Sequence, residues 1–539
     1  MNPDIGSDLV YSHPNICKSV VDVSSKPRQS WVLIFAFSIA AFSLTLASRG
    51  FTTAYSFWID ELFSEKIATS NWPDVYAWLI KDIHPPLYLI GLKLWASLMG
   101  NSELSIRLPS LIAAGFTLFI FAKEAVQRNQ VRRLLALALI GVSPTFVYFA
   151  QEGRSNSIAL LLSSLVTVTA LKLREARFLG DPTNQIRHSI VYYLTAWLLA
   201  MTHYFGSLYI MILCVINLFE GLVEPKRWKS ILLMISILLW PIYSIVFGNL
   251  SRPMASGLSY VTVKPVLGTI KEYLLGCMPI AYPALFIQGS VIRFLLVWSL
   301  LIAIILLSFG SSQRLGNFIK TPNSTNSPVS SESRFLIIVL VLFLSIMILI
   351  DIRRSISVSR HYIVLLPATM LLVANALSAM AGRSHQENLY RIAAVILSFA
   401  LVASLSITAQ ADLSGKIKPM SNWKDMAIFV RKTGICSQGC LVTGSAGLHT
   451  YYFEKEQIPN FQEISSKIPE KEQVKIINSH PQLPVIGFHF AAEQKLSHIL
   501  GDDKTCLQPI QNWSNSVFIL IPKSLPISDI PAPKMIPCT

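Results

Sequence analysis

Apolar segments recur along this chain, separated by short polar connections. Most of them are long enough to cross a hydrocarbon layer of about 30 Å as a helix. We therefore predict a mainly α, polytopic membrane protein with an inner N-terminus. The eleven predicted spans lie at residues 31–48, 107–123, 133–150, 155–173, 188–203, 206–222, 229–247, 291–309, 335–350, 362–381 and 390–409.

The apolar run Leu87–Met99 is too short to span the membrane. Its residues Tyr88, Lys93 and Trp95 suit the headgroup level, which predicts an interfacial helix inside a first outer segment, residues 49–107. Counting it as a span would invert every later loop. The topology chosen here puts the connections that are denser in Lys and Arg inside, as the positive-inside rule expects.

Composition supports this assignment, because 52% of the residues are hydrophobic and only 14% are charged. A soluble chain usually carries about 25% charged residues. The formal charge of +15 is therefore assigned mainly to inner loops that face anionic lipid, and nucleic-acid binding is not expected. The polar tail 1–30 has no signal-peptide pattern, and Lys18, Lys26 and Arg28 place it in the cytoplasm.

Two connections have unusual composition. Residues 311–333 are rich in Ser, Asn and Pro and are predicted to form a flexible cytoplasmic linker. Residues 248–290 form a long outer loop with four prolines. Long loops in compact proteins are often functional, so we expect this one to fold over a bound substrate.

After Gln410 the composition becomes that of a soluble domain, which the topology places outside the membrane. Residues 423–432 have the apolar spacing of a helix, and the runs CLVTG, PVIGFHF and SVFILIP are typical of β-strands. We therefore predict a small α/β domain at residues 411–539. Four of the seven cysteines lie there, at positions 436, 440, 506 and 538. Two disulfides with three possible pairings, free thiols and a metal site at Cys436-x-x-x-Cys440 all stay open. No second ligand pair follows at zinc spacing.

Polar residues gather at the predicted outer ends of the spans. Ionisable groups at bilayer depth are costly and usually face a wet cavity, so their common height predicts one cavity open to the outside. The residues concerned are Asp60, Glu61 and His84, then Gln151, Glu152 and Arg154, then Thr202, His203 and Tyr204, and finally Asp351, Arg353, Arg354, Arg360 and His361.

The chemistry of this cavity follows from the residue types. Asp60 and Glu61 are adjacent, so on a helix they diverge by about 100° and do not share one proton. One can face the reacting centre while the other orients a partner or a metal. A carboxylate suits a general base for a hydroxyl or amine. Arginines suit a departing phosphate, which favours sugar transfer from a polyprenyl-phosphate carrier whose tail stays in lipid.

Each residue also has a purely structural interpretation. The alternatives are an acidic helix turn for Asp60 and Glu61, a helix start for His84, an ion pair between Glu152 and Arg154, an interfacial histidine at His203, and headgroup contacts for the arginines before His361. Arg107 is expected to pair with Glu103 or to anchor a helix end. The functional interpretation depends on the co-location of these residues.

The ordered motifs WIDELFS, HPPLYLIGLKLW, NSELSIRLPS, SPTFVYFAQEGRSNSIALLL, THYFG and SRHYIVLLP resemble the GT-C class of membrane glycosyltransferases. The branch that they resemble most is that of the bacterial relatives of protein O-mannosyltransferases and lipid A aminoarabinose transferases. The resemblance covers residues 31–410. It implies a polyprenyl-phosphate-linked sugar donor, an extracytoplasmic active site in the inner (plasma) membrane, and inversion at the anomeric carbon.

The resemblance also implies residue roles. Asp60 matches the acidic residue taken as catalytic base, Glu61 its acidic neighbour, and Glu152 the acidic position that ends the third span. The family's Q-E-A-R-like motif reads QEGR here, with Gly153 in place of Ala, and Asn156 stands where an aromatic residue is common. The Arg360-His361-Tyr362 run matches the R-Y-like start of a late span near the lipid phosphate. His84, Arg154, His203 and Tyr204 are expected to line the substrate pocket.

Several properties stay open at this stage. Some family members use a divalent metal and others do not, and the acceptor can be a glycan, a lipid or a protein. A lipid-linked sugar flippase is the main rival, and it predicts inverted repeats and ionisable groups at mid-membrane. No repeat is evident in the sequence. A non-catalytic scaffold that presents the C-terminal domain is a third hypothesis.

Overall fold

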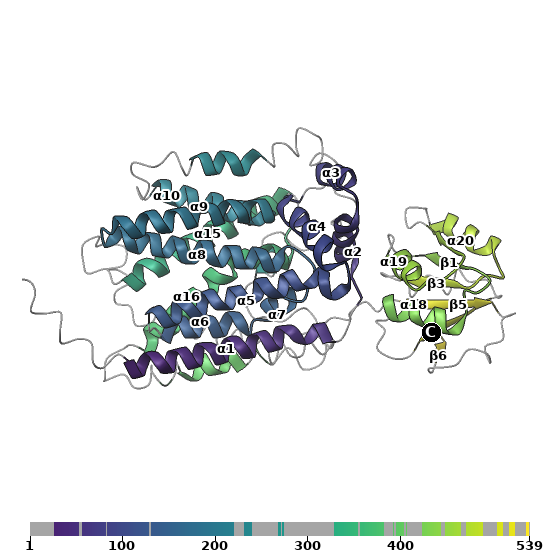
Figure 1. Cartoon of the computed structure of the whole chain (residues 1–539), viewed down its shortest axis with the longest axis horizontal. Coiled ribbons are helices and arrows are strands. Elements are labelled where there is room, and N and C mark those ends of the chain that lie inside the picture. The colour runs from purple at the N-terminus through teal and green to yellow at the C-terminus, as the bar shows by residue number, and fades with distance from the viewer. Residues whose placement is uncertain are drawn as a thin grey trace, which may run out of the picture.

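The structure is a computed structural model of residues 1–539 (Figure 1). It describes residues 26–52, 56–81, 84–128, 131–219, 231–239, 268–270, 272–273, 328–353, 356–381, 392, 395–403, 406, 423–443, 448–464, 470–488, 504–509, 517–522 and 535–537. The predicted span 291–309, most of the outer loop 248–290 and residues 311–327 of the predicted linker lie outside the described residues.

Helices make up the described part of the chain before residue 382. They include α1 (Lys26–Thr52), α2 (Ile59–Thr69), α3 (Trp72–Lys81), α4 (Leu87–Met99), α5 (Glu103–Arg128), α6 (Val131–Gly141), α7 (Pro144–Phe149), α8 (Asn156–Phe178), α9 (Pro182–Thr202), α10 (Tyr204–Phe219), α15 (Pro328–Arg353), the 3-10 helix η2 (Ser359–Leu365) and α16 (Leu366–Ala381).

Five stretches of the described helices are long and apolar enough to cross a membrane, within α1, α5, α8, α15 and the η2–α16 pair. The prediction of a mainly α, polytopic membrane protein is therefore confirmed. The number of eleven spans stays a prediction, because several of the expected spans are described only in part or not at all.

The outside of the helix bundle is apolar. Phe37 in α1 is 74% exposed and Leu349 in α15 is 64% exposed, while the small residues Ala136 and Ala374 are fully buried between helices. A soluble protein rarely exposes contiguous apolar surface on this scale. Hydrocarbon solvates such a surface well, and the intrahelical hydrogen bonds satisfy the backbone there.

The predicted span 133–150 is not one continuous helix. α6 ends at Gly141 and α7 begins at Pro144, because Pro144 has no N–H to donate and disfavours helical geometry in the residue before it. Gly141 also needs its small size, since a Cβ there would lie 2.1 Å from Oγ of Ser43 in α1.

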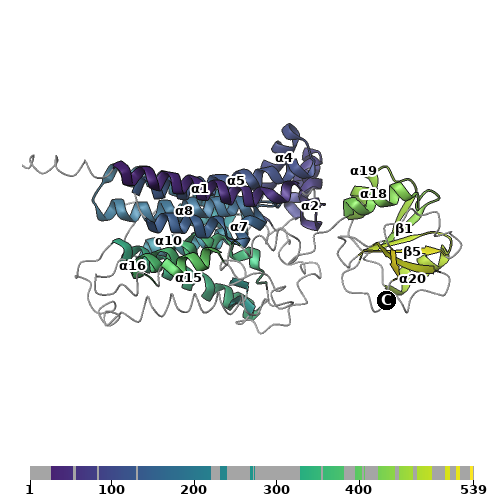
Figure 2. The same cartoon turned by 90° about the horizontal axis from the view of Figure 1, so that it is seen from below.

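Three short helices cover one end of the bundle, where α2 and α4 appear in both views (Figures 1 and 2). The helix predicted at Leu87–Met99 is confirmed as α4, with the same bounds. Leu89 and Leu92 of α4 share a buried core with Leu62 and Ile67 of α2. Its Trp95 indole N–H donates to the carbonyl of Ser105 at 2.9 Å, which fixes α4 to the start of α5.

The C-terminal residues form a six-stranded sheet of order β2-β1-β3-β5-β4-β6. Its elements are α18 (Trp423–Thr433), β1 (Cys440–Thr443), α19 (Leu448–Lys455), β2 (Phe461–Ile464), α20 (Glu470–Ser479), β3 (Val485–Phe488), β4 (Lys504–Pro509), β5 (Val517–Pro522) and β6 (Met535–Pro537). β1 pairs in parallel with β2 and β3, and the remaining pairs are antiparallel. We call residues 423–537 the α/β unit.

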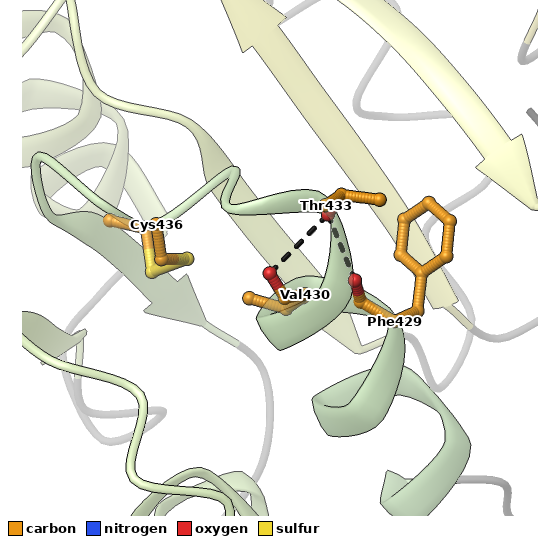
Figure 3. The surroundings of a disulfide bond; sticks show 5 residues. Phe429, Val430, Thr433 and Cys436 are labelled. Atoms are coloured by element: carbon orange, nitrogen blue, oxygen red, sulfur yellow. Dashed lines mark hydrogen bonds between the residues drawn. A yellow bond between two sulfur atoms is a disulfide. The ribbon is translucent and has the colours of Figure 1, made fainter. Parts of the chain in front are cut away.

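Cys436 and Cys440 form a disulfide that links the end of α18 to the start of β1 (Figure 3). The helix end beside it is closed by Thr433, whose hydroxyl donates to the carbonyls of Phe429 at 2.9 Å and Val430 at 3.3 Å. The disulfide alternative is therefore correct for this pair, and the metal alternative is wrong, because bonded sulfurs are not thiolate ligands. The side chains of Cys506 and Cys538 lie outside the described residues.

Candidate active site

Asp60 lies in the first turn of α2 and faces arginines from two other parts of the chain. Its Oδ2 is 3.1 Å from Nη1 of Arg360 in η2 and 3.9 Å from Nη2 of Arg154, in the turn before α8. The Asp60 side chain is 27% exposed, so a bound substrate can reach the carboxylate. The structure thus brings together one carboxylate and two guanidinium groups that the sequence placed in separate outer connections.

The two arginines are held differently. Nη1 of Arg154 donates to the Asp60 carbonyl at 3.2 Å and to Oγ of Ser64 at 3.0 Å, and its side chain is 14% exposed. Arg154 is therefore fixed against the backbone of α2. The Arg360 side chain is 41% exposed, so its guanidinium has surface left for a second anion.

Glu61 points away from Asp60 into the protein, where it is 1% exposed. Its Oε1 accepts from Nε of Arg107 at 2.8 Å and from the backbone N–H of Gly153 at 2.7 Å. Its Oε2 accepts from Nη2 of Arg107 at 2.6 Å and from the N–H of Trp58 at 3.3 Å. These four bonds tie α2 to α5 and to the turn before α8. The partner that holds Arg107 is therefore Glu61, while the expected partner Glu103 acts on it electrostatically.

Gly153 explains one departure from the family motif. A Cβ at this position would lie 2.7 Å from Cγ2 of Ile106 and 3.4 Å from Oε1 of Glu61. The contact with Ile106 of α5 is too short for a side chain, so the close packing of this turn on α5 requires glycine. QEGR in place of a Q-E-A-R-like motif thus fits the position of Ile106 in this chain.

Glu152 is buried on the other side of the same turn. Its Oε2 accepts from Nδ2 of Asn156 at 2.9 Å, and its carbonyl accepts from the Ser110 hydroxyl at 2.6 Å. Asn156 is the residue that stands where the family often has an aromatic side chain, and here it orients Glu152. The guanidinium of Arg154 turns instead to α2, so an ion pair with Glu152 is not the contact that holds it.

His361 and Phe205 stack beside Arg360. Their ring centroids are 4.1 Å apart at an interplanar angle of 22°, and Nδ1 of His361 accepts from the N–H of Val358 at 3.4 Å. The ring of Phe205 also lies 6.1 Å from that of His203. Sequence reasoning did not select Phe205, although the THYFG motif contains it.

His203 follows α9 directly and is 8% exposed. Its Nδ1 is buried without a hydrogen-bond partner among the residues that the structure describes. His84 and Arg360 lie close enough to interact with it electrostatically. Tyr204, the first residue of α10, has a buried hydroxyl. His203 and His84 therefore lie near the arginines that face Asp60, and the pocket that they were expected to line stays a prediction.

Asp351 shapes the turn that presents Arg360, a role that sequence reasoning missed. Its Oδ1 accepts from the N–H groups of Ile356 at 2.9 Å and Ser357 at 3.1 Å, and its Oδ2 accepts from the Thr269 hydroxyl. Asp351 is 3% exposed. Of the other predicted arginines, the side chain of Arg353 and the whole of Arg354 lie outside the described residues.

This arrangement combines a reachable carboxylate with cationic groups on two sides. A carboxylate can take a proton from a hydroxyl or amine within hydrogen-bond reach. A partly exposed guanidinium can hold phosphate oxygens. The backbone beneath both groups is fixed by buried bonds, as a preorganised site requires.

The carboxyl group of Glu65, one turn after Glu61, should make the stability of the folded chain depend on pH. Burial raises the pKa of its carboxyl above 4.5, and the nearby Glu103 raises it further. The amide of Asn101, which donates a hydrogen bond to the carboxyl, and the cations Lys455 and Lys66 lower this pKa but do not offset the burial. The folded chain then keeps this proton after the unfolded chain has lost it. Stability is fully present below about pH 4.5 and falls as pH rises through the folded-state pKa.

We therefore expect Glu65→Gln to raise the thermal midpoint at pH 7.5 and to leave it unchanged at pH 4, since the amide does not ionise. The measurement is the thermal midpoint of the lipid-embedded chain across this pH range. Glu454→Gln, at an exposed position of α19, is the matched control. An equal gain at both pH values would contradict the assignment to Glu65 ionisation.

Comparison with known proteins finds no match by sequence, and matches of low identity among solved structures. No family model matches the sequence, and no curated protein matches it. Among solved structures, ArnT from Cupriavidus metallidurans matches in its apo state with a TM-score of 0.47 and 11% identity over 92% of this chain and 98% of that chain. ArnT bound to undecaprenyl phosphate matches with a TM-score of 0.45 and 13% identity over the same shares.

A further match is the arabinofuranosyltransferase AftD from Mycobacteria, with a TM-score of 0.42 and 11% identity over 92% of this chain and 40% of that chain. ArnT and AftD are GT-C glycosyltransferases, the class that the sequence motifs resemble. At identities this low, the residue roles in this chain follow only from its own contacts.

Proposed function

We propose that this chain is an inverting glycosyltransferase. It moves a sugar from a polyprenyl-phosphate-linked donor to an acceptor on the extracytoplasmic side of the membrane. The observation that carries the proposal is the position of Asp60 between Arg360 and Arg154, at one end of a bundle whose outer surface is apolar. A base and a phosphate-binding cation stand side by side there.

In the proposed reaction Asp60 takes the proton of the acceptor hydroxyl or amine. The acceptor heteroatom attacks the anomeric carbon from the face opposite the phosphate. A bond from the acceptor to that carbon forms as the bond from the carbon to the phosphate oxygen breaks. The proton ends on Asp60, and the negative charge ends on the released polyprenyl phosphate, so configuration inverts.

Arg360 stabilises the departing phosphate, with His361 beside it. Removing or weakening such a preorganised donor typically slows a reaction by about 10²–10³-fold. Arg353 and Arg354 are proposed to add to this phosphate clamp. The polyprenyl tail stays in lipid along the apolar outside of the helices. Glu61 and Glu152 act by holding the surrounding backbone, while His84, His203, Tyr204 and Arg154 line the pocket.

The described residues around Asp60 do not fit a divalent metal. Its charged neighbours are cations, and no group of three His, Cys, Asp or Glu side chains gathers anywhere in the described ranges. The acceptor is proposed as a glycan, a lipid or a protein. The chain is placed in the inner membrane with the α/β unit outside, where an oxidising compartment supports the Cys436–Cys440 disulfide.

A lipid-linked sugar flippase is the alternative function. It would use ionisable groups near mid-membrane, within discontinuous helices. Here the charged residues of the site lie at the end of the bundle, on α2, on η2 and in the turn before α8. That position favours chemistry at the membrane surface over passage through the bilayer.

The test starts from cells that lack this chain. They are expected to accumulate the polyprenyl-phosphate-linked donor, which mass spectrometry of the lipid extract identifies. The full chain in liposomes made with that extract should then release polyprenyl phosphate and transfer the sugar to an acceptor fraction from the same cells. Movement of the lipid-linked sugar across the bilayer without release of polyprenyl phosphate would favour the flippase instead.

A further inference from the structure

Two residues just before α2, Ser56 and Phe57, are held by the α/β unit. The N–H of Phe57 donates to the Tyr452 hydroxyl in α19 at 2.6 Å. The N–H of Lys424, in the first turn of α18, donates to Oγ of Ser56 at 2.8 Å. The contacts join residues that are 395 and 368 positions apart in the sequence.

The side chain of Phe57 contacts a cation of the helix bundle and an aromatic ring of the α/β unit. The guanidinium of Arg107 in α5 lies 5.3 Å from its ring centroid, and the ring of Tyr451 in α19 lies 6.0 Å away. Phe57 and Tyr452 are fully buried. An aromatic side chain in this position makes a large buried contact, and its backbone N–H is then shielded from water.

Ion pairs at the rim add orientation to this contact. Glu103, at the start of α5, lies 3.6 Å from Nζ of Lys424 and 3.4 Å from Nζ of Lys455. The two lysines are 28% and 39% exposed. Exposed pairs of this kind contribute little stability but fix register. The buried Phe57–Tyr452 contact is therefore the stronger of the two links.

The held segment controls where Asp60 lies. Trp58 is the N-cap residue of α2, and its carbonyl accepts from the N–H groups of Glu61 and Leu62 at 3.0 Å each. Asp60 follows two residues later, in the same turn. A displacement of about 1 Å at a reacting group can cost about 10²-fold in rate. Any freedom gained at Phe57 would thus move the carboxylate relative to Arg360.

We propose that Tyr452 is a positioning residue for Asp60, so that the α/β unit completes the active site in place of serving as an independent domain. This inference rests on the proposed function. It assigns the unit a role in turnover through the Phe57 N–H, without contact between Tyr452 and the substrate.

The test compares Tyr452→Phe with Tyr451→Phe in the full chain. Tyr452→Phe removes only the hydroxyl that accepts from the Phe57 N–H. The Tyr451 hydroxyl instead accepts from Lys455 at 3.4 Å, on the exposed rim. We expect Tyr452→Phe to speed hydrogen exchange in a peptide spanning Phe57 about tenfold. We also expect it to lower kcat about tenfold with the donor KM unchanged, and Tyr451→Phe to alter neither.

Wild-type exchange for Tyr452→Phe would overturn the contact, and faster exchange with wild-type kcat would overturn its role in turnover. If Tyr452→Phe lowers the thermal midpoint but keeps the wild-type kcat, the role of Tyr452 in turnover would also be overturned. Absence of transfer by the wild-type chain would instead overturn the proposed function. In that case faster exchange in Tyr452→Phe would still establish that the α/β unit positions α2.

Discussion

Asp60→Asn is expected to abolish sugar transfer while the chain stays folded and inserted. The amide has the size of the carboxylate but does not act as a general base, a contribution worth about 10²–10⁴-fold in rate. The ion pair lost with Arg360 is partly exposed, and exposed pairs contribute about 0–1 kcal/mol. The measurement is release of polyprenyl phosphate from the accumulated donor, beside the thermal midpoint. Near-wild-type turnover would remove Asp60 from the mechanism.

Two further variants make this result specific. Asp74→Asn, at an exposed position of α3, is the matched control and should retain full turnover. Arg360→Gln should weaken donor binding, because charge-assisted hydrogen bonds to phosphate contribute about 1.5–3 kcal/mol. Asp60→Asn should leave donor binding intact. Equal loss of binding in both variants would mean that Asp60 serves to orient Arg360 and not to take a proton.

Arg107→Met is expected to destabilise the chain more than any of the other single substitutions. Glu61 would keep its burial, at 1% exposure, but would lose both bonds from the guanidinium. Breaking a buried ion pair by removing one partner costs about 3–5 kcal/mol. The variant should show a much lower thermal midpoint and a lower yield of inserted protein.

The double variant Glu61→Gln with Arg107→Met provides the control, since it removes the uncompensated charge together with its partner. It should recover a large part of the stability lost in Arg107→Met, because paired residues are strongly non-additive. Loss of the same size in the single and the double variant would show that Arg107 acts through its packing on Phe57 and not through Glu61.

Patterns local in the sequence predicted local structure well. The length and flanks of the apolar run at Leu87–Met99 indicated the helix that became α4, and the β-rich runs after Gln410 became β1, β3 and β5. The helix break between Gly141 and Pro144 was not predicted, although Pro144 is visible in the sequence. The prediction used hydropathy, which is not sensitive to a missing backbone N–H.

Long-range choices were harder to predict. For Arg107 the nearest acidic residue in sequence is Glu103, one helical turn away, and the local pair was expected. Glu103 instead forms ion pairs with Lys424 and Lys455 of the α/β unit, and Arg107 forms its ion pair with the buried Glu61. The meeting of Asp60, Arg154 and Arg360 was predictable, because ionisable residues in an apolar chain have few places to lie. Which carboxylate stayed reachable depended on contacts from residues about 50 to 300 positions away.

The buried Glu61 carboxylate restricts the route by which the proposed polyprenyl-phosphate carrier can enter the site. It accepts hydrogen bonds from Arg107, Gly153 and Trp58. These bonds hold α2 to α5 and to the turn before α8. Arg360 in η2 reaches Asp60 through a partly exposed ion pair. We therefore expect the lipid carrier to enter and leave by separation of η2 from α2, with the Arg360–Asp60 pair breaking as the site opens.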